Sequence, residues 1–152
     1  MQTYFHNLDA STLCGKTIII DIDGTLVADG RSIVSKEAQE TINELSKRNR
    51  LYICSNNKDI QRNKTLSRQI NINFINSAFK KPSKRVIDSI QDYRSGNTII
   101  IGDKFITDGI FARRIGARFI KIKRIRSGEE EMIVKLVYFT DDLIYHLIRI
   151  FL

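Results

Sequence analysis

Short, mostly apolar runs alternate with longer segments of helical periodicity along most of the chain. The apolar runs predict five strands, and the segments between them predict four helices. The strands are expected at 17–22, 50–54, 72–75, 97–101 and 117–122, and the helices at 35–48, 58–69, 82–93 and 106–115. Such alternation is typical of a parallel sheet covered by helices on both faces. The sequence therefore predicts an α/β fold, a Rossmann-like three-layer sandwich with a mostly parallel five-stranded sheet.

Individual residues mark the ends of several predicted helices. Ser35 is a good N-cap for the first helix, and Pro82 stands where the third begins. Gly116 fits the C-cap of the fourth helix. We interpret residues 1–152 as one domain whose core covers about residues 15–122.

The tail over 129–152 is predicted to be helical. Residues 129–139 are expected to form one helix, and Thr140 with Asp141 and Asp142 indicates the N-cap and acidic first turn of a second. Apolar residues then follow at helical spacing. We expect the tail to pack on the sheet, while a membrane surface and a second copy of the chain stay open as alternatives.

Polar side chains follow three of the apolar strands directly. Asp21 and Asp23 end the first strand, where carboxylates beside a core cost several kcal/mol unless a cation or ligand compensates them. Ser55 and Asn56 follow the second strand, and Asp103 follows the fourth. Open α/β sheets bind ligands at the carboxyl ends of their strands. These residues therefore predict a reaction centre at that edge.

Four motifs occur in the order in which haloacid dehalogenase-like (HAD) phosphatases carry them. They are DIDGT at 21–25, SNN at 55–57, KP at 81–82 and GDKFITD at 102–108. With flanking elements, the resemblance covers about residues 15–122. The segments SNN, KKPSKR and GDKFITDGIFARRIGARFIKI most resemble the YqeG-type branch, which includes phosphatidylglycerophosphate (PGP) phosphatases. Gly24 stands where that branch usually has asparagine.

The resemblance implies a role for each matching residue. Asp21 is the expected nucleophile, which forms an aspartyl-phosphate. Asp23 is expected to protonate the leaving oxygen and then to deprotonate the attacking water. Ser55 and Asn56 are expected to bind the phosphoryl group, and Lys81 to neutralise its charge.

The resemblance also implies a magnesium site. Asp103 is expected to bind Mg²⁺ together with the carboxylate of Asp21 and the backbone carbonyl of Asp23, since hard oxygen ligands suit this ion. Three roles stay open for Asp108: a direct ligand, a ligand through water, or a residue that holds Lys81 in place.

Both places where HAD phosphatases insert cap domains are short in this sequence. Residues 27–34 leave room for a turn or small flap only, and residues 58–80 fit one helix and one strand. The chain is therefore predicted to have no cap domain. Capless members of the superfamily tend to act on large substrates or to cover the site by oligomerising, so homo-oligomerisation stays open.

The composition fits a folded domain with an anionic partner. Apolar residues make up 42% and charged residues 28% of the chain, which argues against disorder, and the net charge is +8. That charge favours a phosphorylated substrate or contact with an anionic membrane. No nucleic-acid-binding motif is visible, so no specific nucleic acid is expected. Lys121, Lys123, Arg124 and Arg126 at the active-site edge are expected to form either a solvated loop or a cationic rim that holds an anionic substrate or lipid surface.

Two further absences bear on location and cysteine chemistry. No apolar run approaches the roughly 20 residues of a membrane span, and no signal peptide is apparent. We therefore expect a location in the cytoplasm or at the periphery of a membrane. Cys14 and Cys54 show neither metal-binding nor disulfide spacing, and Cys54 is interpreted as a core residue.

Together these features predict a Mg²⁺-dependent, capless phosphatase that acts on a phosphomonoester. The most specific substrate that the resemblance implies is PGP or a similar bulky phosphomonoester. Three alternatives stay open: a sugar-phosphate phosphatase, a phosphatase of nucleic-acid ends, and a regulatory module that binds phosphate without catalysis.

Overall fold

The computed structural model describes residues 2–91, 93–128 and 132–151 of the chain. Its strands form one sheet in the order β3-β2-β1-β4-β5, and every neighbouring pair is parallel. The strands are β1 (Thr17–Ile20), β2 (Arg50–Ile53), β3 (Asn73–Phe74), β4 (Thr98–Gly102) and β5 (Arg118–Lys121). The predicted parallel five-stranded sheet is therefore confirmed.

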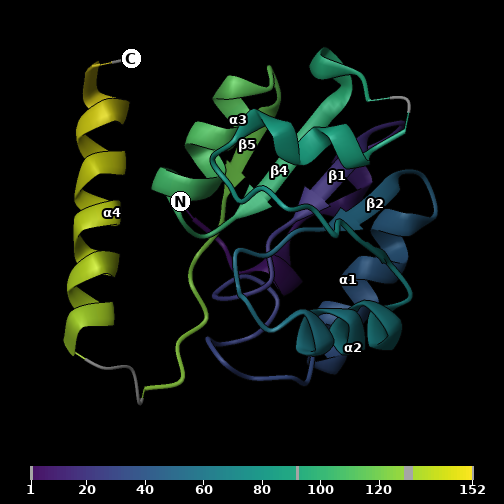
Figure 1. Ribbon diagram of the computed structural model, residues 1–152, viewed down its shortest axis with the longest axis horizontal. Helices are drawn as coiled ribbons and strands as arrows, with labels where there is room; N and C mark the ends of the chain where they lie inside the picture. The colour runs from purple at the N-terminus through teal and green to yellow at the C-terminus, as the bar shows by residue number, and fades with distance from the viewer. Residues whose placement is uncertain (1, 92, 129–131, 152) are drawn as a thin grey trace.

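Helices cover both faces of this sheet (Figure 1). The α-helices are α1 (Lys36–Ser46), α2 (Ile60–Ile70), α3 (Ile110–Arg114) and α4 (Met132–Phe151). Short 3₁₀ turns are η1 (Phe5–Asn7), η2 (Ala10–Thr12), η3 (Lys84–Ser89) and η4 (Ser95–Asn97), and η5 (Phe105–Gly109) is a π-helical turn that leads into α3. Ser35 caps α1 as predicted, because its hydroxyl accepts the Ala38 N–H at 3.2 Å. Gly116 ends α3 with a φ of +67°.

The core lies on both sides of the sheet because successive side chains of a strand point to opposite faces. Ile18 and Ile20 of β1 pack with α1 and α2, whereas Ile19 packs with η3 and α3. Cys54 belongs to the second of these clusters, and burial raises the pKa of its thiol to about 11. The interpretation of Cys54 as a core residue is confirmed.

The connections place the switch point of the sheet beside β1. From β1 the chain moves outward through β2 to β3, and it then crosses back to β4 and β5 on the other side. Ligands bind at the carboxyl ends of the strands that flank such a reversal. Asp21 follows β1 at this point, and Asp103 follows β4.

The helix predicted over 82–93 is wrong in length. Among the described residues of this segment only the 3₁₀ turn η3 forms, with Ser83 as its N-cap, and the chain leaves it at Ile90 in an extended conformation. Ile90 packs in the second core cluster, and the hydroxyl of Tyr93 donates to the carbonyl of Ile115 at 2.5 Å. These tertiary contacts override the local helical preference.

The predicted break in the tail is also wrong. α4 continues through Thr140, whose hydroxyl donates to the carbonyl of Leu136 at 2.9 Å, four residues back along the helix. Asp141 does act as a cap, but for another helix: its carboxylate accepts the N–H groups of Phe105 and Ile106 at the start of η5. Residues 129–131 of the predicted tail lie outside the described part of the chain.

α4 lies along the side of the molecule toward which β4 and β5 run, and it packs against η5 (Figure 1). Within the described residues, no helix combines the length and the apolar content that crossing a membrane requires. The two segments where caps insert in HAD phosphatases carry a short loop after β1 and only α2 and β3 after β2. The site therefore has no cap domain, as predicted.

Candidate active site

A pocket of about 300 Å³ opens at the carboxyl ends of β1 and β2. Its lining combines carboxylates, lysines and small polar groups that come from different loops. These residues are Asp21, Asp23, Asp29, Gly30, Ser55, Asn56, Asn57, Lys81, Lys104 and Thr107. The fold thus brings the predicted residues of the first three motifs into one pocket.

Asp21 and Lys81 form the centre of the site. The Asp21 N–H still bonds to the carbonyl of Ile101 at 2.9 Å, so the backbone is held like a strand while the carboxylate points into the pocket. Lys81 Nζ lies 2.5 Å from Asp21 Oδ1 and 2.6 Å from Asp108 Oδ1. Burial opposes the charge on Lys81, but Asp108 and Asp21 outweigh it and keep the pKa of this lysine well above its usual value.

Asn56 holds Lys81 in place through its backbone. The Asn56 side chain accepts the Lys81 N–H at 2.8 Å and donates to the Lys81 carbonyl at 2.7 Å. Lys80 points elsewhere, since its Nζ donates to the carbonyl of Asn56 at 2.8 Å. The lysine next to the proline is therefore the one that reaches Asp21.

Asp23 lies on the wall of the pocket and is fixed by the side chains of two residues, Arg62 and Ser55. Arg62 of α2 donates to both of its carboxylate oxygens, at 2.8 and 3.3 Å. The hydroxyl of Ser55 donates to Asp23 Oδ2 at 3.2 Å and accepts the N–H of Asn57 at 2.9 Å. Sequence reasoning missed Arg62, because a basic residue on a polar helix carries no sign of the carboxylate that it meets.

Gly24 allows the turn that follows the two aspartates, Asp21 and Asp23. Its φ is +84°, and a Cβ at this position would lie 2.5 Å from Asp103 Oδ2. The glycine that departs from the YqeG-type pattern thus permits the close approach of Asp103 in this chain.

The donors present fit a divalent cation. One carboxylate oxygen from each of Asp21, Asp103 and Asp108 lies within 4.8 Å of the other two. Burial raises the pKa of Asp103, and it raises that of Asp108 to about 7, so both need nearby positive charge in order to be anionic. Lys81 supplies this positive charge to Asp108. The buried Oδ1 of Asp103, by contrast, has no hydrogen-bond partner in the described part of the structure.

Lys104 lies at the mouth of this cluster. Its Nζ is 3.5 Å from the carbonyl of Asp23, the oxygen predicted to hold the metal, and 3.9 Å from Asp29 Oδ1. Burial disfavours the ammonium, but the charges of Asp103 and Asp21 outweigh it and raise the pKa of Lys104. The acidic cluster therefore has a cation of the chain itself at its edge.

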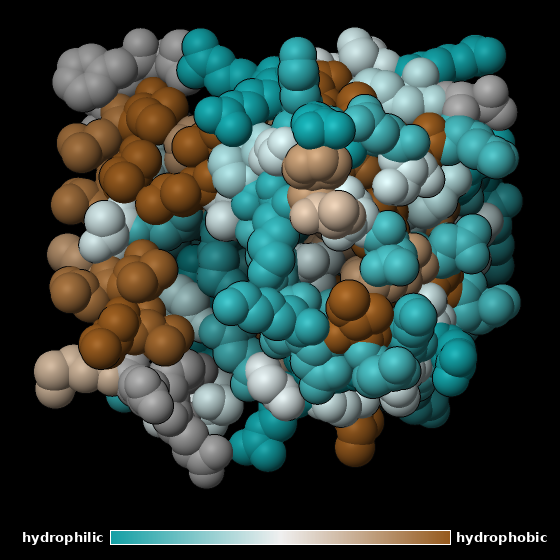
Figure 2. Space-filling view, viewed as in Figure 1, coloured by the Kyte–Doolittle hydropathy of each residue, from teal (hydrophilic) through white to brown (hydrophobic). Residues whose placement is uncertain are grey.

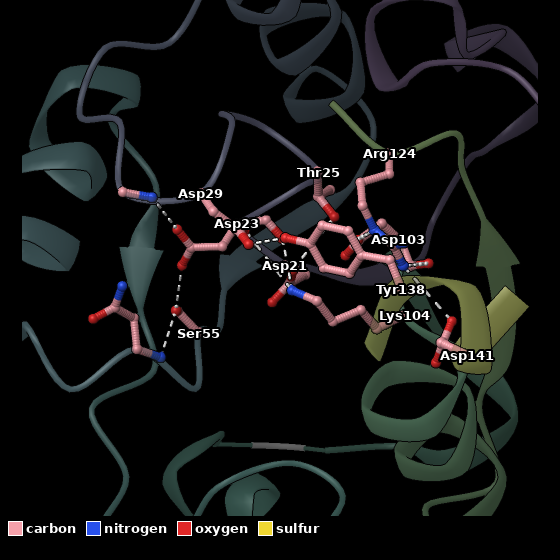
Figure 3. A network of polar contacts seen from close by, with 12 residues as sticks. Asp21, Asp23, Thr25, Asp29, Ser55, Asp103, Lys104, Arg124, Tyr138 and Asp141 are labelled. Carbon is pink, nitrogen blue, oxygen red and sulfur yellow. Dashed lines mark hydrogen bonds and ion pairs between the residues drawn. The ribbon is translucent and has the colours of Figure 1, made fainter. Parts of the chain in front are cut away.

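α4 completes the site, which sequence reasoning did not foresee (Figure 3). Tyr138 reaches from α4 to Asp29, to which its hydroxyl donates. The Tyr138 ring lies 3.9 Å from the guanidinium carbon of Arg124, and Arg124 is in turn paired with Asp103. The chain position of Tyr138, more than 100 residues after Asp29, gave no signal of this contact.

Both interpretations of the basic segment, a solvated loop and a cationic rim, are wrong for two of its four residues. Lys121 and Arg124 are buried: Lys121 Nζ lies 2.9 Å from Asp141 Oδ2, and Arg124 contacts Asp103. Both join α4 to the loop after β4. Lys121 pairs with Asp141 and donates to the carbonyl of Asp103, and Arg124 pairs with the carboxylates of Asp103 and Asp141. Lys123 and Arg126 are exposed, so only these two are available at the surface.

Replacing Asp141 by alanine should lower the free energy of unfolding by about 3 kcal/mol, because it leaves Lys121 buried and short of a partner and uncaps η5. Asp142 is the matched control: it pairs with the same lysine at 3.1 Å, but its side chain is 40% exposed. Asp142→Ala should cost less than about 1 kcal/mol. Urea unfolding measures the free energy of unfolding of both variants. An equal decrease in the two variants would contradict the role given to Asp141.

Residues 5–125 match the family model described as mitochondrial PGP phosphatase. The chain belongs to this family. Membership of the mitochondrial PGP phosphatase family and the HAD-like fold identify a capless phosphatase, as the motifs predicted. The family's name does not fit the expectation of a plainly cytoplasmic protein.

Two solved structures share the fold of this PGP phosphatase family member. The first is an uncharacterized protein from Listeria monocytogenes serotype 4b, with a TM-score of 0.55 and 20% identity over 68% of this chain and 76% of that one. The second is the HAD-hydrolase YfnB from Bacillus subtilis, bound to magnesium, with a TM-score of 0.53 and 13% identity over 70% and 86% of the two chains. No curated protein matches the chain.

Proposed function

We propose that the protein is a Mg²⁺-dependent phosphatase that hydrolyses a bulky phosphomonoester, PGP in the first place, through an aspartyl-phosphate on Asp21. One observation carries this proposal. The Asp21 carboxylate faces the pocket 2.5 Å from a buried lysine, with two further carboxylates close enough to share a cation. A carboxylate held in this way is suited to attack phosphorus, because positive charge surrounds the place where the phosphoryl oxygens would lie.

In the first step, an oxygen of Asp21 attacks phosphorus, and the bond from phosphorus to the ester oxygen breaks. Lys81 stabilises the charge on the phosphoryl group. Asp23 gives the proton that it took from water in the preceding turnover to the departing alcohol oxygen, so the alcohol leaves neutral and the phosphoryl group stays on Asp21. Arg62 and Ser55 keep the Asp23 side chain oriented toward the pocket during this transfer.

In the second step, water attacks the same phosphorus, and the bond from phosphorus to Asp21 breaks. Asp23, now a carboxylate, takes the proton of the attacking water. The products are inorganic phosphate and the free Asp21 carboxylate. The fixed position of Asp23 beside the pocket suits both proton transfers, since one group serves as acid and then as base.

Asp21, Asp103 and the carbonyl of Asp23 would hold Mg²⁺, while Asp108 holds Lys81. When bound, the ion supplies positive charge that offsets the repulsion between the carboxylates and the phosphoryl oxygens. Two findings support this assignment: the buried Asp103 Oδ1 that lacks a partner among the described residues, and the magnesium bound to the HAD-hydrolase YfnB.

The size of the pocket and the absence of a cap support a substrate with a large group outside the site. A volume of about 300 Å³ is at the lower end for ligand pockets, enough for a phosphorylated headgroup but not for acyl chains. The lipid part of PGP would then lie outside the pocket. The family to which the chain belongs points to the same substrate.

A comparison of two phosphomonoesters tests the substrate. With Mg²⁺ present, kcat/KM for PGP in mixed micelles should exceed that for glycerol 3-phosphate by at least about 100-fold, because contacts to the remote part of a substrate contribute to transition-state binding. The Asp21→Asn protein, prepared in parallel, controls for contaminating phosphatases. Equal or faster turnover of the small phosphomonoester, or of a sugar phosphate, would overturn PGP as the substrate.

A further inference from the structure

The outward side of α4 is an exposed apolar surface (Figure 2). We call it the outer face of α4 and define it by six residues, each about half or more exposed. They are Met132, Ile133, Leu136, Val137, Phe139 and Leu143, with exposed fractions between 49 and 85%. Single exposed apolar residues are ordinary, but a contiguous set on one helix marks an interaction surface.

The opposite side of α4 has a separate task. Tyr138 and Asp141 are buried against the active-site loops, where they contact Asp29 and Lys121. Packing within the domain therefore accounts for the inward side of this helix alone. The outer face remains in contact with water, although burying it would be favourable.

Charge decides between an acidic membrane and a second copy of the chain. The net charge is +8, so two copies repel each other, whereas an acidic lipid surface attracts each copy. Lys123 and Arg126, in the segment that leads to α4, are exposed, and so is Lys135 on the helix itself. Of the two acidic residues of α4, Asp141 is buried in its pair with Lys121, and Asp142 pairs with the same lysine at 3.1 Å but is 40% exposed. Three glutamates precede the helix in the sequence, at positions 129–131.

We propose that the outer face of α4 docks on the surface of an acidic lipid bilayer. An amphipathic helix with this pattern lies in the plane of the interface with its apolar side among the acyl chains. The exposed lysines and arginine would then contact the headgroups. This occupant agrees with the finding that no described helix is suited to span a membrane.

Docking in this orientation would bring the active site to the membrane. Tyr138 contacts the site from the inward side of α4, so a helix diameter of about 10 Å would separate the pocket edge from the interface. The inference goes beyond the proposed function, because membrane binding requires no turnover. Loss of membrane binding with activity retained would therefore count against this inference alone, and loss of activity with membrane binding retained would count against the proposed function alone.

Vesicle sedimentation tests the proposal with the full chain. Wild-type protein should sediment with vesicles of phosphatidylcholine that contain about 30% phosphatidylglycerol, and much less with pure phosphatidylcholine. Leu136→Gln with Leu143→Gln should weaken binding at least about tenfold, since it removes two apolar anchors without a change in charge. Ile33→Gln with Ile60→Gln is the matched control, which changes two exposed apolar residues elsewhere and should bind like wild type.

Two further measurements complete the test. Turnover of a small soluble phosphomonoester should be the same in wild type and in the α4 variant, which shows that the pocket is intact. Sedimentation velocity should find a monomer in both. The proposal is overturned if wild type does not bind the acidic vesicles, if the α4 variant binds as well as wild type, or if wild type is a dimer that the α4 variant dissociates.

Discussion

Asp21→Asn should lower phosphatase turnover by at least about 10³-fold, because an amide of the same volume cannot form the covalent intermediate. The other carboxylates of the site are engaged elsewhere, and Asp29 accepts from Tyr138. Asp23 is held on the wall by Arg62, while Asp103 and Asp108 are buried and engaged with Arg124 and Lys81. The measurement is kcat with para-nitrophenyl phosphate and saturating Mg²⁺.

Asp88→Asn controls for the chemical change itself. Asp88 is a solvent-exposed aspartate that pairs with Arg85 at 3.8 Å, away from the pocket, and its amide variant should keep turnover within about twofold of wild type. Thermal unfolding of the Asp21→Asn protein checks that the fold survives. Retention of more than about a tenth of wild-type turnover by a folded Asp21→Asn protein would rule out the proposed nucleophile.

Chelation should abolish activity, and Mg²⁺ should restore it. The acidic cluster of Asp21, Asp103 and Asp108 is buried, and without a bound cation the Asp103 Oδ1 atom lacks a partner among the described residues. Ca²⁺ should restore activity poorly, because it prefers longer bonds and more ligands than Mg²⁺ and would misplace the Asp21 carboxylate. Activity after dialysis against a chelator, with each ion added back, measures this effect.

Asp103→Asn separates loss of the metal from loss of the fold. The variant keeps an acceptor for Arg124 but removes one negative charge, so binding of Mn²⁺, followed by electron paramagnetic resonance, should weaken at least about tenfold. Unfolding in urea should change much less than metal binding does. Full activity in excess chelator would exclude a role for the metal, and unchanged Mn²⁺ binding by this variant would exclude Asp103 as a ligand.

The sheet and the residues at its edge could be predicted because both depend on local pattern. An isoleucine run that ends in Asp21 and Asp23 shows where β1 stops, and parallel strands then bring Asp103 to the same edge. Lys81, chosen over Lys80 for its place before the proline, is the lysine that contacts Asp21. Each of these inferences needs only the sequence around one strand or helix end and the rule that the strands are parallel.

The contribution of α4 could not be predicted in the same way. Asp141 looked like a cap for its own helix but caps η5, and Arg124 looked like a surface cation but is buried against Asp103. In both cases the sequence shows the charge and not the partner, which comes from a distant part of the chain. The same reason explains why Arg62 and Tyr138 were missed.

The most direct test of the account is to trap the phosphoryl group on Asp21. para-Nitrophenolate leaves without a proton, so the Asp23→Asn variant should complete the first step with para-nitrophenyl phosphate and Mg²⁺, but should be slow in the second, which needs a base. The account predicts a burst of one para-nitrophenolate per chain. It also predicts, after acid quenching, one phosphoryl group on the peptide that contains Asp21, released by hydroxylamine. A burst without a phosphoryl group on that peptide, or a phosphoryl group on another residue, would contradict it.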